Sequence, residues 1–279
     1  MSRKVEKIYS DLVDEQLNVD SSLCFGNLTK KGKYDLEKFE FDIDSPELAR
    51  KIGKAEGHYT TINCSKILPH LTEVQDYVAE QISQSLKIFF TRAISKKSPK
   101  VMVVGLGNRG LVADSLGVAV TDRLISTIQI PKELCTKLGK LCFLNTGVGG
   151  ITGIASFDVV KGVASIVKPD IVIAIDALVA HNPARLGCSF QISNSGITPG
   201  AGVKNYLRTL NKQNLGCSVV AIGVPMMISG SNLCENIQKG ISEKIFAPKE
   251  VDIYIDKCAR TISNAINIAV HGKSYKNYC

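Results

Sequence analysis

The chain has 279 residues, of which 44% are hydrophobic and 22% charged, a composition typical of a globular protein and not of a disordered one. Its net charge of +8 arises in the body of the chain, because residues 1–60 carry a small acidic excess; a basic body permits nucleic-acid binding, but no recognised motif accompanies it. No apolar run is long enough to span a membrane and the first twenty residues lack the apolar stretch of a secretory signal, so we expect a cytoplasmic protein that binds neither membrane nor nucleic acid.

Apolar periodicity predicts alternating helices and strands after a weakly periodic N-terminal region. Short continuous apolar runs are typical of strands covered on both faces, and a 3.6-residue period is typical of helices. In chain order we predict a helix from Thr72 to Phe89, a strand at Val101–Val104, a helix over 114–125, a strand at Leu141–Leu144, a helix at Phe157–Val167, a strand over 171–175, a short strand over 190–192, a strand over 219–222 closed by Gly223 and Pro225, and a helix over 255–269 ended by Gly272.

This order predicts an α/β fold with a mostly parallel central sheet and helices on both faces, of the phosphorylase or hydrolase kind, built as a single core with an N-terminal extension. In such sheets, ligands and catalytic groups collect at the carboxyl ends of the strands. The nine cysteines are scattered and form no Cys-x-x-Cys pair, so we expect neither a disulfide framework nor a zinc site.

The first strand leads into Gly105-Leu-Gly-Asn-Arg-Gly110, which matches the G-x-G-x-x-G pattern of dinucleotide-binding proteins. That function also requires an acidic residue at the end of the next strand, where this chain has Asn145-Thr-Gly. The predicted helix also begins several residues after the last glycine. We therefore favour a tight turn that needs glycine backbone freedom, and we expect no cofactor.

Two aspartates stand out near predicted strand ends. Asp114 precedes a predicted helix and, taken alone, fits a helix N-cap. Asp176 follows five apolar residues directly, and a carboxylate at the end of a buried strand must have a partner or a raised pKa. If the two share a site, repulsion holds one protonated while the other stays ionised, which suits general acid and base catalysis. Metal binding is the alternative use of such a pair. His181 follows closely and is a further candidate.

Several motifs in fixed order resemble the bacterial spore germination protease family. They span about residues 100–226, with a weaker likeness at Glu56-Gly-His-Tyr-Thr. The motifs are Val103-Val-Gly-Leu-Gly-Asn-Arg, Asp114-Ser-Leu-Gly, Gly150-Ile-Thr-Gly-Ile, Lys161-Gly-Val, Lys168-Pro-Asp-Ile-Val-Ile-Ala-Ile-Asp-Ala-Leu, Gln191-Ile-Ser, Gly196-Ile, Pro199-Gly-Ala-Gly-Val and Val220-Ala-Ile-Gly-Val-Pro.

The resemblance implies an endopeptidase that degrades small acid-soluble spore proteins during germination by an atypical aspartic mechanism, with Asp114 and Asp176 as the catalytic pair. It implies a homo-oligomer, expected to be a tetramer, located in the forespore or spore core, and a fold related to that of hydrogenase maturation proteases. We expect no resident metal, and we expect the substrate to approach the glycine-rich loops and His181. The predicted substrate-binding residues are Gly105, Gly107, Asn108, Gly150, Thr152, Gly153 and His181.

The family is made as a zymogen that removes its own N-terminal segment, and Ser10-Asp-Leu-Val-Asp-Glu15 resembles its processing region. The resemblance thus implies a propeptide over residues 1–15 and a single peptidase domain over 16–279.

The chain also departs from the family pattern. Val112-Ala113 replaces the usual Thr-Pro, Asn194 replaces an Asp, Thr198 replaces a His, Lys204-Asn-Tyr-Leu replaces Gly-Asn-Lys-Arg, and the chain is short. These changes keep two alternatives open: a binding or regulatory protein without turnover, and a metal-dependent maturation peptidase.

Overall fold

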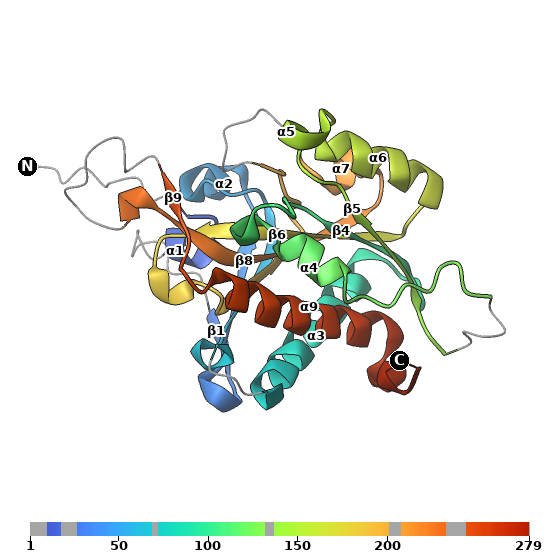
Figure 1. Cartoon of the computed structure of the whole chain (residues 1–279), viewed down its shortest axis with the longest axis horizontal. Coiled ribbons are helices and arrows are strands. Elements are labelled where there is room, and N and C mark those ends of the chain that lie inside the picture. Colours follow the sequence, from blue (N-terminus) through green and yellow to red (C-terminus); the bar gives the residue numbers. More distant parts are fainter. Residues whose placement is uncertain are drawn as a thin grey trace, which may run out of the picture.

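The computed structural model describes residues 10–17, 27–68, 72–131, 137–200, 208–232 and 244–278. Within them, one mixed sheet crosses the molecule in the strand order β1-β2-β3-β7-β8-β6-β4-β5, and β9 pairs with β8 (Figure 1). The strands are β1 (Asn27–Lys31), β2 (Glu37–Ile43), β3 (Gly57–Asn63), β4 (Lys100–Gly105), β5 (Lys140–Asn145), β6 (Ile171–Ala180), β7 (Ser189–Ser193), β8 (Ser218–Ser229) and β9 (Ile245–Phe246).

Helices cover both faces of the sheet, as predicted. The long helices α3 and α9 lie with α4 against one face, and α5, α6 and α7 lie on the other (Figure 1). The helices are α1 (Val13–Leu17), α2 (Pro46–Ile52), α3 (Thr72–Ala93), α4 (Leu116–Thr121), α5 (Gly149–Thr152), α6 (Ser156–Val167), α7 (Lys212–Leu215) and α9 (Val251–His271).

The strands β5, β4, β6 and β8 are parallel, and the apolar runs predicted all four of them. Their side chains alternate between two cores. Ile173 packs with residues of α3 and α9, whereas Val172 packs with residues of α6. The α/β class is therefore confirmed. The other half of the sheet, β1, β2, β3 and β7, is antiparallel and comes partly from the N-terminal region in which we predicted no strand.

Two strands run further than predicted. β6 was expected to end at Asp176 and β8 at Gly223, but the strands pair with each other as far as Ala180 and Ile228. Their neighbour β4 ends at Gly105, which pairs with Ile175. From Asp176 onward, β6 therefore has no described strand on its β4 side. We call this side of residues 176–180 the open edge of β6.

Residues 10–17, the N-terminal arm, pack against the body of the molecule. Leu12 is fully buried and lies with Leu178, Ala180 and Leu186, and Val13 is fully buried in a cluster formed by β2, β3 and α2. The arm includes the short helix α1. Its apolar anchors place it beside the extended part of β6.

The stability lost on truncating an isoleucine should depend on how deeply that isoleucine is buried. Ile173 in β6 is 0% exposed, whereas Ile166 at the end of α6 is 82% exposed. We expect Ile173→Ala to lower the free energy of unfolding by about 2–5 kcal/mol, and Ile166→Ala by less than about 0.5 kcal/mol. Chemical denaturation of both variants measures the difference, and equal losses would contradict the assigned core.

Candidate active site

A tight loop after β4 presents Asp114. Gly107 has φ +98°, and a Cβ atom there would lie only 2.0 Å from the main-chain oxygen of Asp114. The Asn108 N–H donates to that oxygen at 3.0 Å. A 3-10 turn (Val112–Asp114) follows, and α4 begins only at Leu116. The helix therefore starts after Asp114 and ends at Thr121, so the N-cap interpretation of Asp114 is wrong, because Ser115 occupies the position before α4.

Asp176 lies within β6, one residue beyond Ile175, which forms the last pair with β4. It pairs with Gly223 of β8, and its Oδ1 accepts a hydrogen bond from Ala177 N–H at 3.0 Å. Our prediction that Asp176 ends its strand was wrong, since β8 extends the pairing beyond it. The prediction that it stands at the carboxyl edge of the sheet holds relative to β4 and β5, which both end just before it.

The two carboxyl groups are electrostatically coupled. Burial raises the pKa of Asp176 well above its usual value, and the negative charges of Asp114 and Asp11 raise it further. Burial also raises the pKa of Asp114, but the main-chain N–H of Asn108 opposes this by favouring the carboxylate. Both carboxyl groups therefore hold a proton more tightly than usual, and ionisation of Asp114 favours the protonated form of Asp176. One carboxylate and one carboxylic acid that share a site can act as a base and an acid on the same bound molecule.

The loop residues predicted to bind substrate fall into two groups. Gly107 and Asn108 contact Asp114 directly, whereas Gly105 is the last residue of β4. A Cβ atom on Gly105 would lie 2.5 Å from the Asn145 side chain and 2.6 Å from the Gly117 carbonyl, so the loop packs closely there. The absence of a side chain at Gly105 and Gly107 therefore allows this close packing around the loop. Contact with substrate stays a prediction.

Gly150, Thr152 and Gly153 lie in and after α5, at the carboxyl end of β5. They are exposed, and the Thr152 hydroxyl is hydrogen-bonded within its own turn, donating to Val148 O at 3.2 Å and accepting from Ile154 N–H. No hydrogen bond links these three residues to either aspartate in the described part of the chain. Their predicted role in substrate binding remains untested.

The N-terminal arm lies at the same site, which our sequence analysis did not predict. Asp11 N–H donates to Val179 O at 2.8 Å, and the Asp11 carboxylate accepts from Val179 N–H at 2.8 Å. The Gln191 side chain holds the arm from β7, accepting from Val13 N–H at 2.8 Å. Lys54 donates to Ser10 O at 3.0 Å. The sequence signals for this contact were the acidic excess of the N-terminal region and the likeness of residues 10–15 to the family's processing region.

Two buried acidic side chains anchor the second half of the arm. Glu15 accepts from the main-chain N–H groups of His181 at 2.7 Å and Asn182 at 2.9 Å. Asp14 forms an ion pair with Arg185. His181 therefore contributes its main chain to this contact, while its buried Nδ1 has no hydrogen-bond partner among the described residues.

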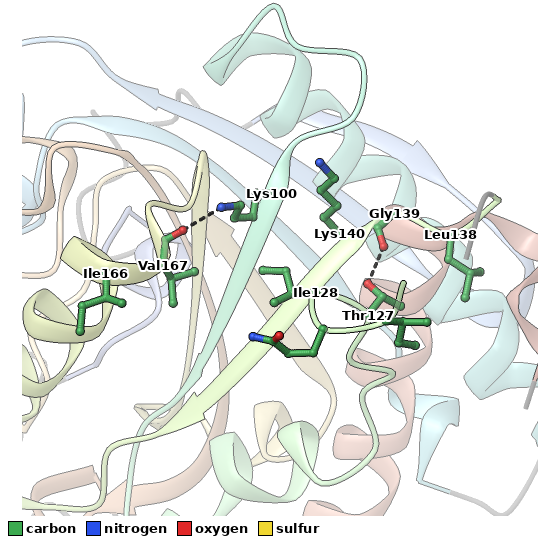
Figure 2. Close-up of a pocket in the computed structure, with 10 residues that line it drawn as sticks. Lys100, Thr127, Ile128, Leu138, Gly139, Lys140, Ile166 and Val167 are labelled. Atoms are coloured by element: carbon green, nitrogen blue, oxygen red, sulfur yellow. Dashed lines mark hydrogen bonds between the residues drawn. The ribbon is translucent and has the colours of Figure 1, made fainter. Parts of the chain in front are cut away.

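A separate cavity lies at the opposite edge of the sheet (Figure 2). Lys100 and Lys140, the first residues of β4 and β5, contribute to its lining together with Thr127 and Ile166. The Lys100 ammonium group donates to Val167 O at 2.8 Å and the Thr127 hydroxyl to Gly139 O at 2.6 Å, so both groups have partners within the wall. The cavity is remote from Asp114 and Asp176 along the strands.

Two of the residues that depart from the family pattern form side-chain hydrogen bonds within the chain. The Asn194 Oδ1 accepts from His58 N–H at 2.8 Å, and the hydroxyls of Thr198 and Thr209 are 2.8 Å apart. Val112 and Ala113 form the turn that leads to Asp114. The Lys204-Asn-Tyr-Leu stretch lies outside the described residues.

Within the described ranges, no group of three or more His, Cys, Asp or Glu side chains is placed to hold a metal ion. No helix in the same part of the chain is long and apolar enough to cross a membrane.

The close approach of Gly107 to Asp114 predicts a specific stability cost. Gly107→Ala is expected to lower the free energy of unfolding by about 3 kcal/mol, because the new Cβ atom combines an unfavourable positive φ with overlap against Asp114. Gly216→Ala is the matched control: it has φ +75° and nothing within 4 Å, so we expect only about 1 kcal/mol. Denaturant unfolding of both variants compares the two losses, and equal values would mean that the loop relaxes freely around Asp114.

A family model described as germination protease matches residues 14–241 of this chain. Among curated proteins, the germination protease of Clostridium acetobutylicum is 28% identical over 85% of each chain. That of Caldanaerobacter subterraneus subsp. tengcongensis is 31% identical over 79% of this chain and 80% of its own. Among solved structures, the [NiFe] hydrogenase maturation protease HycI from Thermococcus kodakarensis KOD1 is 21% identical, covers 65% of this chain and 98% of its own, and has a TM-score of 0.38.

Proposed function

This chain belongs to the germination protease family, and we propose that it is an endopeptidase that degrades small acid-soluble spore proteins during spore germination. Family membership supports a peptidase acting on protein. The observation that carries the aspartic mechanism is the coupling of two carboxyl groups with unequal, raised pKa values at the carboxyl edge of β4 and β6. Unequal pKa values at one site are the arrangement that acid–base hydrolysis requires.

In this mechanism, the Asp114 carboxylate removes a proton from a water molecule as the water attacks the carbonyl carbon of the scissile peptide bond. Asp176 gives its proton to the carbonyl oxygen as the tetrahedral intermediate forms. Collapse of the intermediate breaks the C–N bond, the leaving nitrogen takes the proton from Asp114, and the oxygen returns its proton to Asp176. The two groups then hold their original protons for the next cycle.

We further propose that the chain is made as a zymogen with a propeptide over residues 1–15 and a peptidase domain over 16–279. The arm supports this, because Asp11 pairs with Val179, three residues beyond Asp176, and its charge contributes to the raised pKa of Asp176. In this account a homo-oligomer, expected to be a tetramer, acts in the forespore or spore core.

Digestion of a purified small acid-soluble spore protein tests the proposal. Mass spectrometry should detect cleavage by the chain after its N-terminal segment is removed, and no cleavage by Asp114→Ala or Asp176→Ala. Cleavage by either variant at the original rate would reject the paired-acid mechanism. Loss of activity on chelation would favour the metal-dependent alternative. Binding without turnover, after release of the arm, would favour the regulatory alternative that the changes at Asn194 and Thr198 suggest.

A further inference from the structure

The open edge of β6 is an unusual feature at the centre of a sheet. On one side β6 pairs with β8 up to Ala180, but on the other side β4 stops at the pair Gly105–Ile175. The Ile175 carbonyl accepts from Leu106 N–H at 2.9 Å, and beyond this bond β4 has left the sheet. The next residue that faces this side is Ala177, whose N–H donates to Asp176 Oδ1, and beyond it the main-chain groups of Val179 and His181 are open to a different chain segment.

The arm uses these groups at alternate residues. Val179 offers both its N–H and its C=O, and Asp11 takes both at 2.8 Å. Two residues further, the His181 N–H is taken by the Glu15 carboxylate at 2.7 Å. A spacing of two residues is the spacing at which a strand presents its main chain to one neighbour. The arm satisfies these groups partly with side-chain oxygens, because it turns into α1 at Val13.

We propose that the open edge of β6 is the main-chain binding site for the protein substrate: an extended substrate segment adds to Val179 and His181 as a strand in line with β4, once the arm has left. This inference rests on the proposed function, because it names how the same site holds its substrate. Strand addition supplies affinity through the main chain and therefore tolerates variation in substrate sequence.

The position of the edge explains why such a strand would be cut. Asp176 belongs to the same strand, three residues before Val179, and extended chain advances about 3.3 Å per residue. A substrate strand paired at Val179 thus reaches Asp176 roughly 10 Å further along, about three residues from the one that pairs. The arm already bridges part of this distance, since the charge of Asp11 acts on Asp176. Arm and substrate would compete for one set of main-chain groups.

Hydrogen exchange of individual amides tests the occupancy of the edge without requiring turnover. In the full-length chain, the N–H groups of Val179 and His181 should exchange slowly. In full-length Asp11→Ala/Glu15→Ala, which lacks two arm anchors, they should exchange at least about tenfold faster. Adding a purified small acid-soluble spore protein to this variant, with Asp114→Asn also present to prevent cleavage, should slow them again. Binding of that protein without renewed protection would overturn the proposal.

A proline substitution tests the same contact by kinetics. The Val179 N–H faces the open edge, so Val179→Pro removes that donor and leaves the ladder with β8 intact. In the Asp11→Ala/Glu15→Ala background we expect KM for the spore protein to rise about fivefold relative to Val179→Ala, as for one lost hydrogen bond, with kcat changed less than about twofold. Equal KM values for the proline and alanine variants would contradict strand addition.

The two experiments separate this inference from the proposed function. Cleavage of the spore protein without renewed protection of Val179 and His181 would overturn strand addition and leave the peptidase function standing. Renewed protection without cleavage by the Asp114-containing chain would support the edge as a binding site and reject the peptidase function.

Discussion

Replacing Asp176 with asparagine is expected to lower the rate of spore-protein cleavage by roughly 10²–10⁴-fold, the usual contribution of a general acid or base. Asparagine has nearly the same shape and fits the same position in β6, but it carries no proton that it can donate to a carbonyl oxygen and recover. The measurement is kcat/KM for the chain without its N-terminal segment. Asp158→Asn, an exposed residue of α6, is the control and should retain full activity.

The same substitution should change how stability depends on pH. Because the folded-state pKa of Asp176 is raised above the unfolded value near 3.8, the folded protein binds the proton more tightly. The stability contributed by this carboxyl group is present below pH 3.8 and is lost as the pH rises through the folded pKa. Asp176→Asn should therefore gain stability relative to the wild type across that window. An unfolding free-energy difference that does not vary with pH would contradict the raised pKa.

Replacing Arg185 with alanine is expected to release the N-terminal arm. Asp14 and Arg185 are both largely buried, with side-chain exposures of 9% and 18%, so removing the guanidinium leaves an unpaired carboxylate and costs about 3–5 kcal/mol. Burial raises the pKa of Asp14 even though the charge and hydrogen bond of Arg185 lower it, so the ionised form of Asp14 depends on this guanidinium group. Because the arm contributes no strand to the sheet, we expect this cost to appear as lost arm docking.

The undocked fraction should then rise by about 10²–10⁴-fold, measured as faster proteolysis of residues 10–17 in the intact chain. Asp14→Ala/Arg185→Ala should restore part of the docking, because no buried charge is left alone. Arg109→Ala, which removes an exposed ion pair with Asp122, should leave proteolysis unchanged. Unchanged proteolysis in Arg185→Ala would mean that the ion pair does not hold the arm.

Most of the parallel half of the sheet could be predicted because β4, β6 and β8 are covered on both faces. Such strands are continuous apolar runs, as at Val101–Val104, and they can be recognised locally. The helices around them show the 3.6-residue period for the same reason, as α3 and α9 do. Where burial is one-sided, the signal is weaker: Phe39, Phe41 and Ile43 alternate along β2, a strand pattern that our reading of the N-terminal region overlooked.

The ends of β6 and β8 could not be predicted from local sequence. Asp176, Gly223 and Pro225 each favour termination when considered alone, but each strand supplies the partner that extends the other. The register shift between Leu178 and Val179 accompanies the proline. This mutual extension, together with the early end of β4, creates the open edge of β6, so the edge depends on pairings between distant segments.

Asp114 and Asp176 were selected as a candidate pair from residue type, position and family resemblance, but their surroundings could not be predicted. Sequence identified Asp114 and Asp176, and the structure gives both a raised pKa. The arm contacts require Asp11 and Glu15 to meet residues more than 160 positions away in the chain, and no periodicity encodes such a meeting. The role of Gly107 likewise depends on the path of the loop, since its missing Cβ atom leaves room for Asp114.

The pH dependence of kcat/KM for spore-protein cleavage tests the central claim most directly, namely that Asp114 and Asp176 act as a coupled base and acid. Measured on the chain without its N-terminal segment, the rate should follow a bell-shaped curve, falling at low pH as Asp114 is protonated and at high pH as Asp176 loses its proton. A rate that stays constant across both limbs, or a bell that persists unchanged in Asp176→Asn, would contradict it.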